Sequence, residues 1–314
     1  MATYKESIGT AVQNVAGDPP APLIGQVWYN SSTFSFRVRR SFTGLSWSTG
    51  NDMNSTRNAM GSAGTQTAAL AFGGMPTGIN ATEKYNGTNW TAANPLNSPI
   101  SKLGSAGTQT SALGFGGIPT SSPTGQTESY NGTNWTTVNP LNTARYELSG
   151  CGASNTAALA FGGGNPYKAE TEKWNGSNWT EVSNLNSARK ACGGAGTNTA
   201  ALAFGGTSPG VLTELWNGSN WTAVNPMNTG RRDIGSAGDQ TAALAFGGNP
   251  VQATTESWNG TNWTTVNSLN SAREEVGGTG TNTVALAFGG GPPYVATEEW
   301  NSGPITESQT ITVT

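Results

Sequence analysis

Short apolar segments recur along this chain, and each one ends in Phe-Gly-Gly. The diglycines lie at intervals of 43, 46, 43, 42 and 42 residues, after Phe72, Phe115, Phe161, Phe204, Phe246 and Phe288. In the third copy, the stretch Ala157–Phe161 is apolar at every position. A short run without alternation is typical of a strand that is buried on both faces. Each copy therefore predicts the inner part of one repeated β-unit.

A polar turn between aromatic residues completes each copy. The third copy places Asn175-Gly176 between strands that carry Trp174 and Trp179. Asn-Gly in this setting is a strong hairpin signal, because both residues tolerate positive φ. Four short strands per period of this length indicate a propeller blade, so six copies predict an all-β, six-bladed β-propeller. The rings could also form a stacking platform for sugars or bases, but their regular spacing favours packing between blades.

The two ends of the chain complement each other. Residues 42–57 align without gaps on residues 258–273, so the N-terminal part holds the second half of a repeat. The last copy lacks that half, because Ile305 occupies the tryptophan position. We predict that the strand around Trp47 completes the last blade and closes the ring, which removes free sheet edges.

The repeat also sets the expected domain boundaries. We expect residues 1–35 to form a short extended docking segment and residues 36–314 to form the propeller. The tail 305–314 alternates like a strand, which predicts either an outer strand or pairing with another subunit. Seven blades stay open as an alternative, if residues 27–29 and 36–39 build an additional sheet.

Composition narrows the functional classes. The net charge is −3, with 11% charged residues and no histidine. A chain without a basic surface is not expected to bind nucleic acid. Histidine is the commonest metal ligand and general base, so we expect no metal, no cofactor and no catalytic residues. No apolar stretch suits a signal peptide or a membrane span, so membrane insertion is not expected.

Two cysteines, Cys151 and Cys192, are predicted to lie in the same strand of neighbouring repeats. A disulfide or redox pair is one interpretation of them. The favoured one is that both are small apolar fillers.

Arginine and glutamate each recur at one position of the repeat, and no carboxylate pair stands apart as a catalytic pair would. One interpretation is a ring of guanidinium groups that grips an acidic ligand. The favoured interpretation is a structural Arg–Glu or Arg–backbone contact in each blade. These residues are Arg57, Arg145, Arg189, Arg231, Arg273, Glu83, Glu128, Glu172, Glu214, Glu256 and Glu298, and Ile100 is the exception in the arginine series.

The copies differ at two segments, the loop after the diglycine and the triplet after the arginine. Variable segments on a constant repeat frame are the usual place for recognition, although they are also where a surface is unconstrained. The binding candidates are Tyr167, Tyr294, Lys168, Tyr146 and Lys102.

With Phe-Gly-Gly, the spaced aromatic and tryptophan, and the arginine that opens the next copy, residues 42–300 resemble the Kelch family of propellers. The chain departs from Kelch proteins in its very short turns and its lack of histidine. Galactose oxidase, a copper enzyme, shares the architecture that the resemblance implies. Its histidine ligands have no counterpart here, so its activity is not carried over.

The N-terminal run Gly25-Gln26-Val27-Trp28-Tyr29-Asn30-Ser31 resembles segments in structural and tail-fibre proteins of tailed bacteriophages. The Ala-Leu-Ala-Phe-Gly-Gly repeats are similar to propeller proteins of marine phages. These resemblances imply a virion protein that is made in the host cytoplasm and displays its propeller for adhesion, host recognition, or capsid or tail decoration. The implied docking residues are Trp28, Tyr29, Pro19 and Pro20.

The partners implied are other virion proteins, reached through residues 1–35, and a glycan or protein of the host surface. Association into homo-oligomers stays open. One alternative is a bacterial Kelch-like module for protein–protein interaction. Another, from a different class, is a glycan-active enzyme of galactose-oxidase or lyase type, against which the absence of histidine counts.

Overall fold

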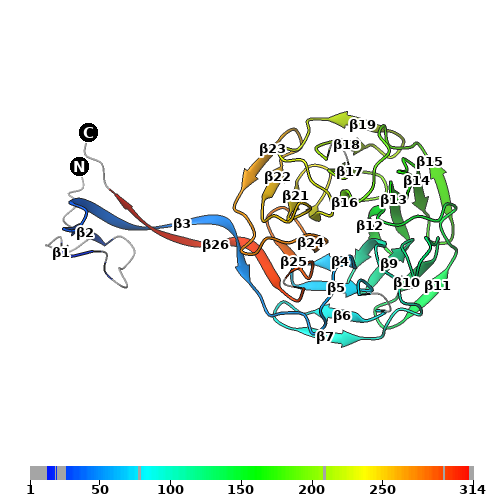
Figure 1. The fold of residues 1–314 in the computed structure, drawn as a ribbon, viewed down its shortest axis with the longest axis horizontal. Coiled ribbons are helices and arrows are strands. Elements are labelled where there is room, and N and C mark those ends of the chain that lie inside the picture. Colours follow the sequence, from blue (N-terminus) through cyan, green and yellow to red (C-terminus); the bar gives the residue numbers. More distant parts are fainter. Residues whose placement is uncertain are drawn as a thin grey trace. The chain divides into compact units, whose positions relative to one another are not determined.

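The fold of the chain is a propeller of six four-stranded blades, seen here in a computed structural model (Figure 1). The structure describes residues 13–17, 19, 26–76, 79–207, 210–292 and 294–310. Within these ranges the secondary structure consists of strands, and no helix is long and apolar enough to cross a membrane. The all-β prediction is confirmed.

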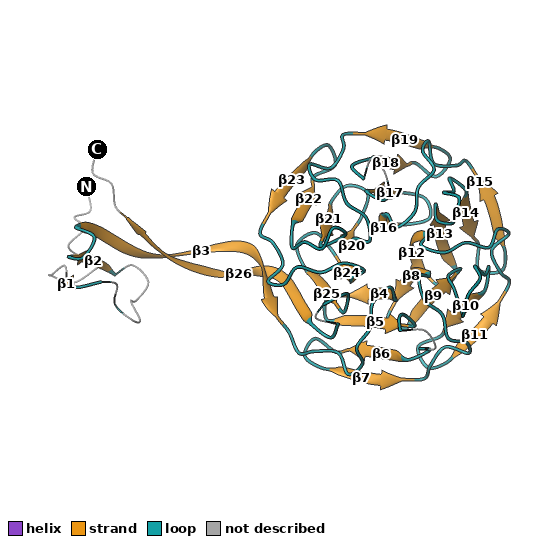
Figure 2. Cartoon of the chain, viewed as in Figure 1, coloured by secondary structure: helices purple, strands orange, loops and turns teal. Residues whose placement is uncertain are grey.

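Each of the first five blades is built from consecutive antiparallel strands, numbered from the axis outward (Figure 2). Blade 1 contains β4 (Gly61–Thr65), β5 (Ala68–Phe72), β6 (Thr82–Tyr85) and β7 (Trp90–Ala93); blade 2 contains β8 (Gly104–Thr108), β9 (Ser111–Phe115), β10 (Thr127–Tyr130) and β11 (Trp135–Val138); blade 3 contains β12 (Ser149–Ser154), β13 (Ala157–Phe161), β14 (Thr171–Trp174) and β15 (Trp179–Val182). Blade 4 contains β16 (Gly193–Gly196), β17 (Ala201–Phe204), β18 (Thr213–Trp216) and β19 (Trp221–Val224); blade 5 contains β20 (Gly235–Gly238), β21 (Ala243–Phe246), β22 (Thr255–Trp258) and β23 (Trp263–Val266).

The sixth blade joins the two ends of the chain. Its sheet has the order β1-β2-β3-β26-β25-β24, in which β24 (Gly277–Gly280), β25 (Ala285–Phe288) and β26 (Thr297–Thr310) are followed by β3 (Ser35–Thr49). The N–H of Gly50 donates to the carbonyl of Thr297 (2.8 Å), and Ser48 Oγ donates to the carbonyl of Glu299. The predicted closure by the strand around Trp47 is therefore confirmed. The ring has six blades, and the seven-bladed alternative is wrong because β1 (Gln13–Val15) and β2 (Val27–Asn30) extend the sixth sheet.

The aromatic residues pack each blade against its neighbour. Six tryptophan rings each lie 4.7–5.0 Å, centroid to centroid, from the Phe-Gly-Gly phenylalanine of the preceding blade in the ring. For Trp90 of blade 1, the preceding blade is blade 6. Each tryptophan Nε1–H also donates to a threonine Oγ1 at 2.9–3.1 Å. Trp47 does both, to Phe246 and Thr255, so the closing strand packs as the other outer strands do. The rings are core, as predicted, and each satisfies its polar atom.

Glycines of the inner strands allow this packing. A Cβ on Gly150 of β12 would lie 2.3 Å from the ring of Phe115 in the neighbouring blade. Real side chains do not tolerate such an approach, so a Cβ at Gly150 would require the ring of Phe115 to move. The side chains of Leu159 and Phe161 on β13 are completely buried.

The chain forms two compact units. One contains residues 46–301, and the other contains residues 1–45 together with residues 302–314. The propeller accounts for the first unit. In the second, β1 pairs in parallel with β2, and β2 pairs with β3 in an antiparallel register. The propeller unit begins at Ser46 and ends at Asn301, a shorter range than the residues 36–314 expected from the repeat. The tail 305–314 continues β26 as far as Thr310 beside β3 in the sheet order, and its last four residues lie outside the described ranges.

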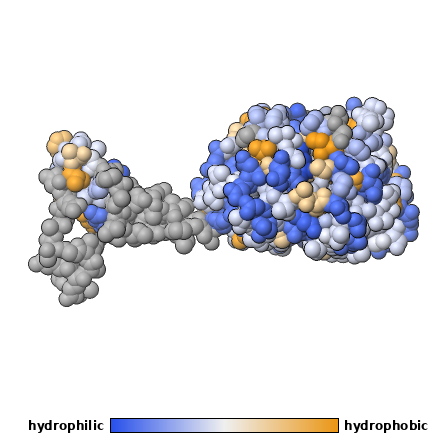
Figure 3. Space-filling view, turned by 90° about the horizontal axis from the view of Figure 1, so that it is seen from below, coloured by the Kyte–Doolittle hydropathy of each residue, from blue (hydrophilic) through white to orange (hydrophobic). Residues whose placement is uncertain are grey.

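The side of the propeller seen in Figure 3 is mostly hydrophilic, with small, separate hydrophobic patches. Its outward-facing strand positions carry Thr, Ala and Glu, as in the sequence Trp-Thr-Glu-Val of β15, of which only the tryptophan is buried.

Candidate functional site

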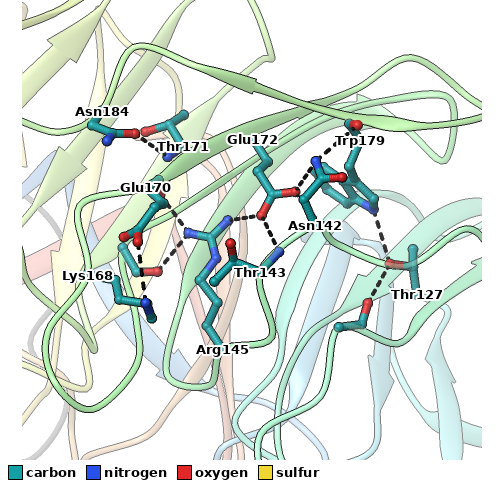
Figure 4. Close-up of polar contacts among 12 residues, drawn as sticks. Thr127, Asn142, Thr143, Arg145, Lys168, Glu170, Thr171, Glu172, Trp179 and Asn184 are labelled. Carbon is teal, nitrogen blue, oxygen red and sulfur yellow. Dashed lines mark hydrogen bonds and ion pairs between the residues drawn. The ribbon is translucent and has the colours of Figure 1, made fainter.

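The recurrent arginine and glutamate form a clamp at five of the six blade junctions, shown for Arg145 in Figure 4. Arg145 Nη2 donates to Glu172 Oε1 at 2.8 Å, and Nη1 donates to the carbonyls of Gly162 and Glu170. Glu172 also accepts from the backbone and side-chain nitrogens of Asn142. The clamp thus ties the connection before β12 to strand β14 of the same blade.

Four further arginine–glutamate ion pairs occupy the equivalent positions. The nitrogen–oxygen distances are 2.7–3.3 Å, in the pairs Arg57–Glu83, Arg189–Glu214, Arg231–Glu256 and Arg273–Glu298. At the junction that has Ile100, Glu128 accepts instead from Gln126 Nε2 (2.9 Å) and from the backbone of Asn97. The sequence therefore replaces the missing guanidinium with the amide of Gln126, which directly precedes the same strand, β10 (Thr127–Tyr130).

Burial decides what these arginines can do. Their side chains are 0–2% exposed, which leaves no face for an external anion. Burial lowers the pKa of Arg145, and the charge of Glu172 opposes that shift. A buried ion pair with every oxygen used in hydrogen bonds is a structural element.

The two variable segments lie on one face of the propeller. Isolated bridges join four of the six triplets to the loop after the diglycine, as between Asn58 and Met75, and backbone hydrogen bonds join the other two at Tyr146 and Lys190. The Asn-Gly turns lie at the other ends of the strands, because Phe72 pairs with Thr82 at the variable end and Ala69 pairs with Tyr85 at the turn end. We call the face with the variable segments the variable face, and the other the turn face.

A closed ring of backbone hydrogen bonds surrounds the axis on the variable face. The middle residue of each triplet has φ between 48° and 56°, and its N–H donates to the carbonyl of the equivalent residue in the preceding blade at 2.7–3.2 Å. Residues with a Cβ adopt this left-handed conformation at a cost, so the ring holds them there. The six members of this axial ring are Ala59, Lys102, Glu147, Ala191, Asp233 and Glu275.

Four of the six ring residues carry charge. Glu147 forms ion pairs with Lys102 and, at 2.7 Å, with Lys190. Burial raises the pKa of Glu147, but hydrogen bonds to these lysines outweigh it and hold the pKa below its usual value. Burial together with the charge of Glu147 raises the pKa of Asp233 to about 6, and burial together with Asp233 raises that of Glu275 to about 7.

The axis itself holds two cavities. The one among the axial-ring residues has a volume of about 110 Å³. Beneath it lies a ring of six apolar side chains, and beyond that ring a cavity of about 250 Å³ lined by serines, alanines and glycines of the inner strands. The apolar ring consists of Met60, Leu103, Leu148, Cys192, Ile234 and Val276.

Of the predicted binding residues, three belong to one cluster. The Nζ of Lys190 lies 5.3 Å from the ring centroid of Tyr146 and 5.9 Å from that of Tyr167. Through Glu147 the cluster reaches Lys102. Tyr167 is 48% exposed and presents the largest free ring of this group.

The other two predicted binding residues, Lys168 and Tyr294, make different contacts. Lys168 forms a half-buried ion pair with Glu170 (3.3 Å). Tyr294, from the loop of blade 6, lines a separate cavity with Asn58 and Met75.

Sequence reasoning missed Glu147, Asp233, Glu275 and Lys190 as individual candidates. The sequence does contain a signal for these residues, because each is a charged residue at the first or middle position of a variable triplet. The axial ring could not be read from it, because the ring depends on hydrogen bonds between blades.

In the N-terminal unit, the proposed docking residues have different environments. Trp28 is fully buried, and the ring of Tyr29 lies 5.1 Å from that of Phe36. Phe34 and Phe36 are 80% and 44% exposed. Pro19 is half-buried, and Pro20 lies outside the described residues.

The cysteines are free and buried. Cys151 lies in β12, whereas Cys192 directly precedes β16, so their predicted placement in equivalent strands is wrong. Burial raises the pKa of Cys151 to about 12, and burial also raises that of Cys192. Such thiols are poor nucleophiles, which suits a packing role.

Within the described ranges, no group of His, Cys, Asp or Glu is arranged to hold a metal ion. No family model and no curated protein matches the chain. The propeller fold therefore stands on the structure, and the Kelch and phage resemblances stay expectations from sequence motifs.

Proposed function

We propose that this chain is a non-enzymatic recognition protein that binds its partner with the variable face of the propeller. The observation that carries the proposal is the gathering of both variable segments on that one face, around a frame that is otherwise repeated. A six-bladed propeller is compatible with an interaction module, and variable segments on a fixed frame are where such modules differ.

We further propose that the chain is a phage virion protein that uses residues 1–35 to dock on the particle and displays the propeller for adhesion or decoration. The support is the resemblance of the Gly-Gln-x-Trp-Tyr-Asn-Ser run to phage structural proteins. The exposed rings of Phe34 and Phe36 add apolar surface of the kind found at protein interfaces.

Mass spectrometry of washed particles tests the virion role. We expect the chain to be present, and we expect an amine-reactive cross-linker to join Lys5 to other virion proteins. Absence of the chain from washed particles would contradict the role, and would favour the bacterial interaction module instead. Lys102, Lys168 and Lys190 serve as internal controls, because the proposal leaves the variable face free of other virion proteins.

A further inference from the structure

One cavity of the variable face is built almost entirely from positions that differ between blades. It has a volume of about 320 Å³, within the usual range for small-ligand sites. Two backbone connections hold its walls: Arg57 N–H donates to the carbonyl of Tyr294 (3.1 Å), and Met75 N–H donates to the carbonyl of Asn58 (2.8 Å). We call it the Tyr294 cavity; its lining residues are Thr56, Arg57, Asn58, Met75, Pro76 and Tyr294.

The aromatic ring in this cavity occurs at one blade junction only. At every junction, the backbone N–H at the arginine position donates to the carbonyl of one residue in the loop of the preceding blade. The residues that accept this bond at the other five junctions are the equivalents of Tyr294, and none of them is aromatic. They are Ile79, Thr124, Lys168, Gly210 and Gln252. The cavity therefore breaks the sixfold repeat, as a site for one ligand would.

Gly291 makes room for the ring. A Cβ on Gly291 would lie 2.8 Å from Cε1 of Tyr294, so the ring rests directly on the backbone of Gly291. Four other blades place Met75, Ile118, Thr207 or Asn249 at the position of this glycine, and blade 3 has a second glycine there, Gly164. Tyr294 keeps 44% of its surface exposed in this position.

The lining is neutral and amphipathic. Arg57 is completely buried, and its guanidinium is engaged by Glu83 and the carbonyl of Ala81. Among the described residues, the side chain of Asn58 has no hydrogen-bond partner, and it offers both a donor and an acceptor. Thr56 adds a hydroxyl, while Met75 and Pro76 supply apolar wall.

We propose that the Tyr294 cavity binds a neutral hexopyranose, with the apolar face of the sugar stacked on Tyr294 and its hydroxyl groups bonded to Asn58 and Thr56. A pyranose has this combination of an apolar face and a hydroxyl-bearing edge. A charged ligand would find no counter-charge in the lining. The inference rests on the proposed recognition role, for which it supplies the ligand class.

Saturation-transfer NMR with methyl β-galactopyranoside and methyl α-glucopyranoside tests the proposal on the full chain. We expect one of the two to bind with a dissociation constant on the order of 1 mM, and glucuronate to bind more weakly. Tyr294→Ala should weaken binding roughly tenfold, because it removes the stacking ring. Tyr294→Phe should retain binding within about a factor of two, and Gly291→Ala should weaken it by displacing the ring.

Tyr167→Ala is the matched control, because Tyr167 is an exposed tyrosine of the same face outside the cavity. No saturation transfer to either sugar, equal binding by Tyr294→Ala, or stronger binding of glucuronate would overturn the proposal. The side chain of Tyr294 is partly exposed, and the hydrogen bond between Tyr294 and Arg57 uses the backbone carbonyl of Tyr294. Tyr294→Ala should therefore have the same melting temperature as the parent protein. Absence of the chain from particles would overturn the virion role and leave sugar binding in place, so the two failures are distinguishable.

Discussion

Arg145 and Glu147 lie two residues apart in one connection, yet they belong to different parts of the molecule. Arg145 is repeated at five of six junctions, is fully buried and is clamped to Glu172. Glu147 occupies a position that holds Ala, Lys, Glu or Asp in different blades, and it faces an axial cavity. The clamp requires an arginine and a glutamate side chain, whereas the axial ring requires only that the backbone adopt a left-handed conformation. What is repeated therefore builds the frame, and the frame leaves the neighbouring side chains free to vary.

Removing the closing strand should have the largest effect on the frame. We expect deletion of residues 1–50 to lower the melting temperature by roughly 10 °C or more, because blade 6 then loses β3 and the buried Trp47. Circular dichroism measures the transition. Deletion of residues 1–30, which keeps β3, is the control and should change the propeller's transition little. Equal melting of both variants would contradict closure by β3.

Breaking one clamp should come next in magnitude. Arg145→Ala leaves Glu172 buried without its partner, which should cost about 3–5 kcal/mol of unfolding free energy. Tyr146→Ala, the neighbouring variable position, should cost no more than about 1 kcal/mol. Urea denaturation compares the two, and similar losses for both would remove the distinction between repeated and variable positions.

The axial ring should make stability depend on pH. The folded pKa values of Asp233 and Glu275, about 6 and about 7, lie above their ordinary values of 3.8 and 4.5. The folded state then binds more protons than the unfolded state in this interval, so stability falls as pH rises from about 4 to about 7. Burial is the first cause, with Glu147 and Glu274 adding to it and Lys102 and Arg232 opposing it at Asp233.

Asp233→Asn with Glu275→Gln should remove this fall. We expect the double variant to gain about 1–2 kcal/mol per site over the parent at pH 8, after allowance for the partial exposure of these groups, and to gain nothing at pH 4. Denaturant curves at both values of pH measure the difference. An equal gain at the two values would show that the carboxyl groups do not titrate in this way.

The smallest effect is expected at the exposed rim. Lys168→Ala should change stability by less than about 0.5 kcal/mol, because its ion pair with Glu170 is partly open to solvent. The same denaturant assay applies. A loss of more than about 1 kcal/mol of unfolding free energy would show that Lys168 contributes to stability as the repeated residues do.

The sequence was enough to predict the blades and the closing strand around Trp47 and to favour six blades, because these depend on spacing and on residue types that recur in every copy. It left seven blades open, because it did not show where residues 27–39 would pair. The axial ring escaped prediction because its left-handed residues include no glycine or asparagine. Their conformation comes from partners in the next blade. Tyr294 was predicted as a contact residue from its exposed loop, but its cavity also needs Gly291 and Asn58, which meet only when the ring closes.

The most direct test of the account is whether the variable face performs recognition. We propose to measure how purified protein competes with particle adsorption to host cells. The account predicts that Tyr146→Ala, Tyr167→Ala and Tyr294→Ala combined abolish competition at an unchanged melting temperature. Thr133→Ala, Ser177→Ala and Thr261→Ala combined, on the exposed turns of the turn face, should leave competition intact. Competition that survives the first set and is lost with the second would contradict it.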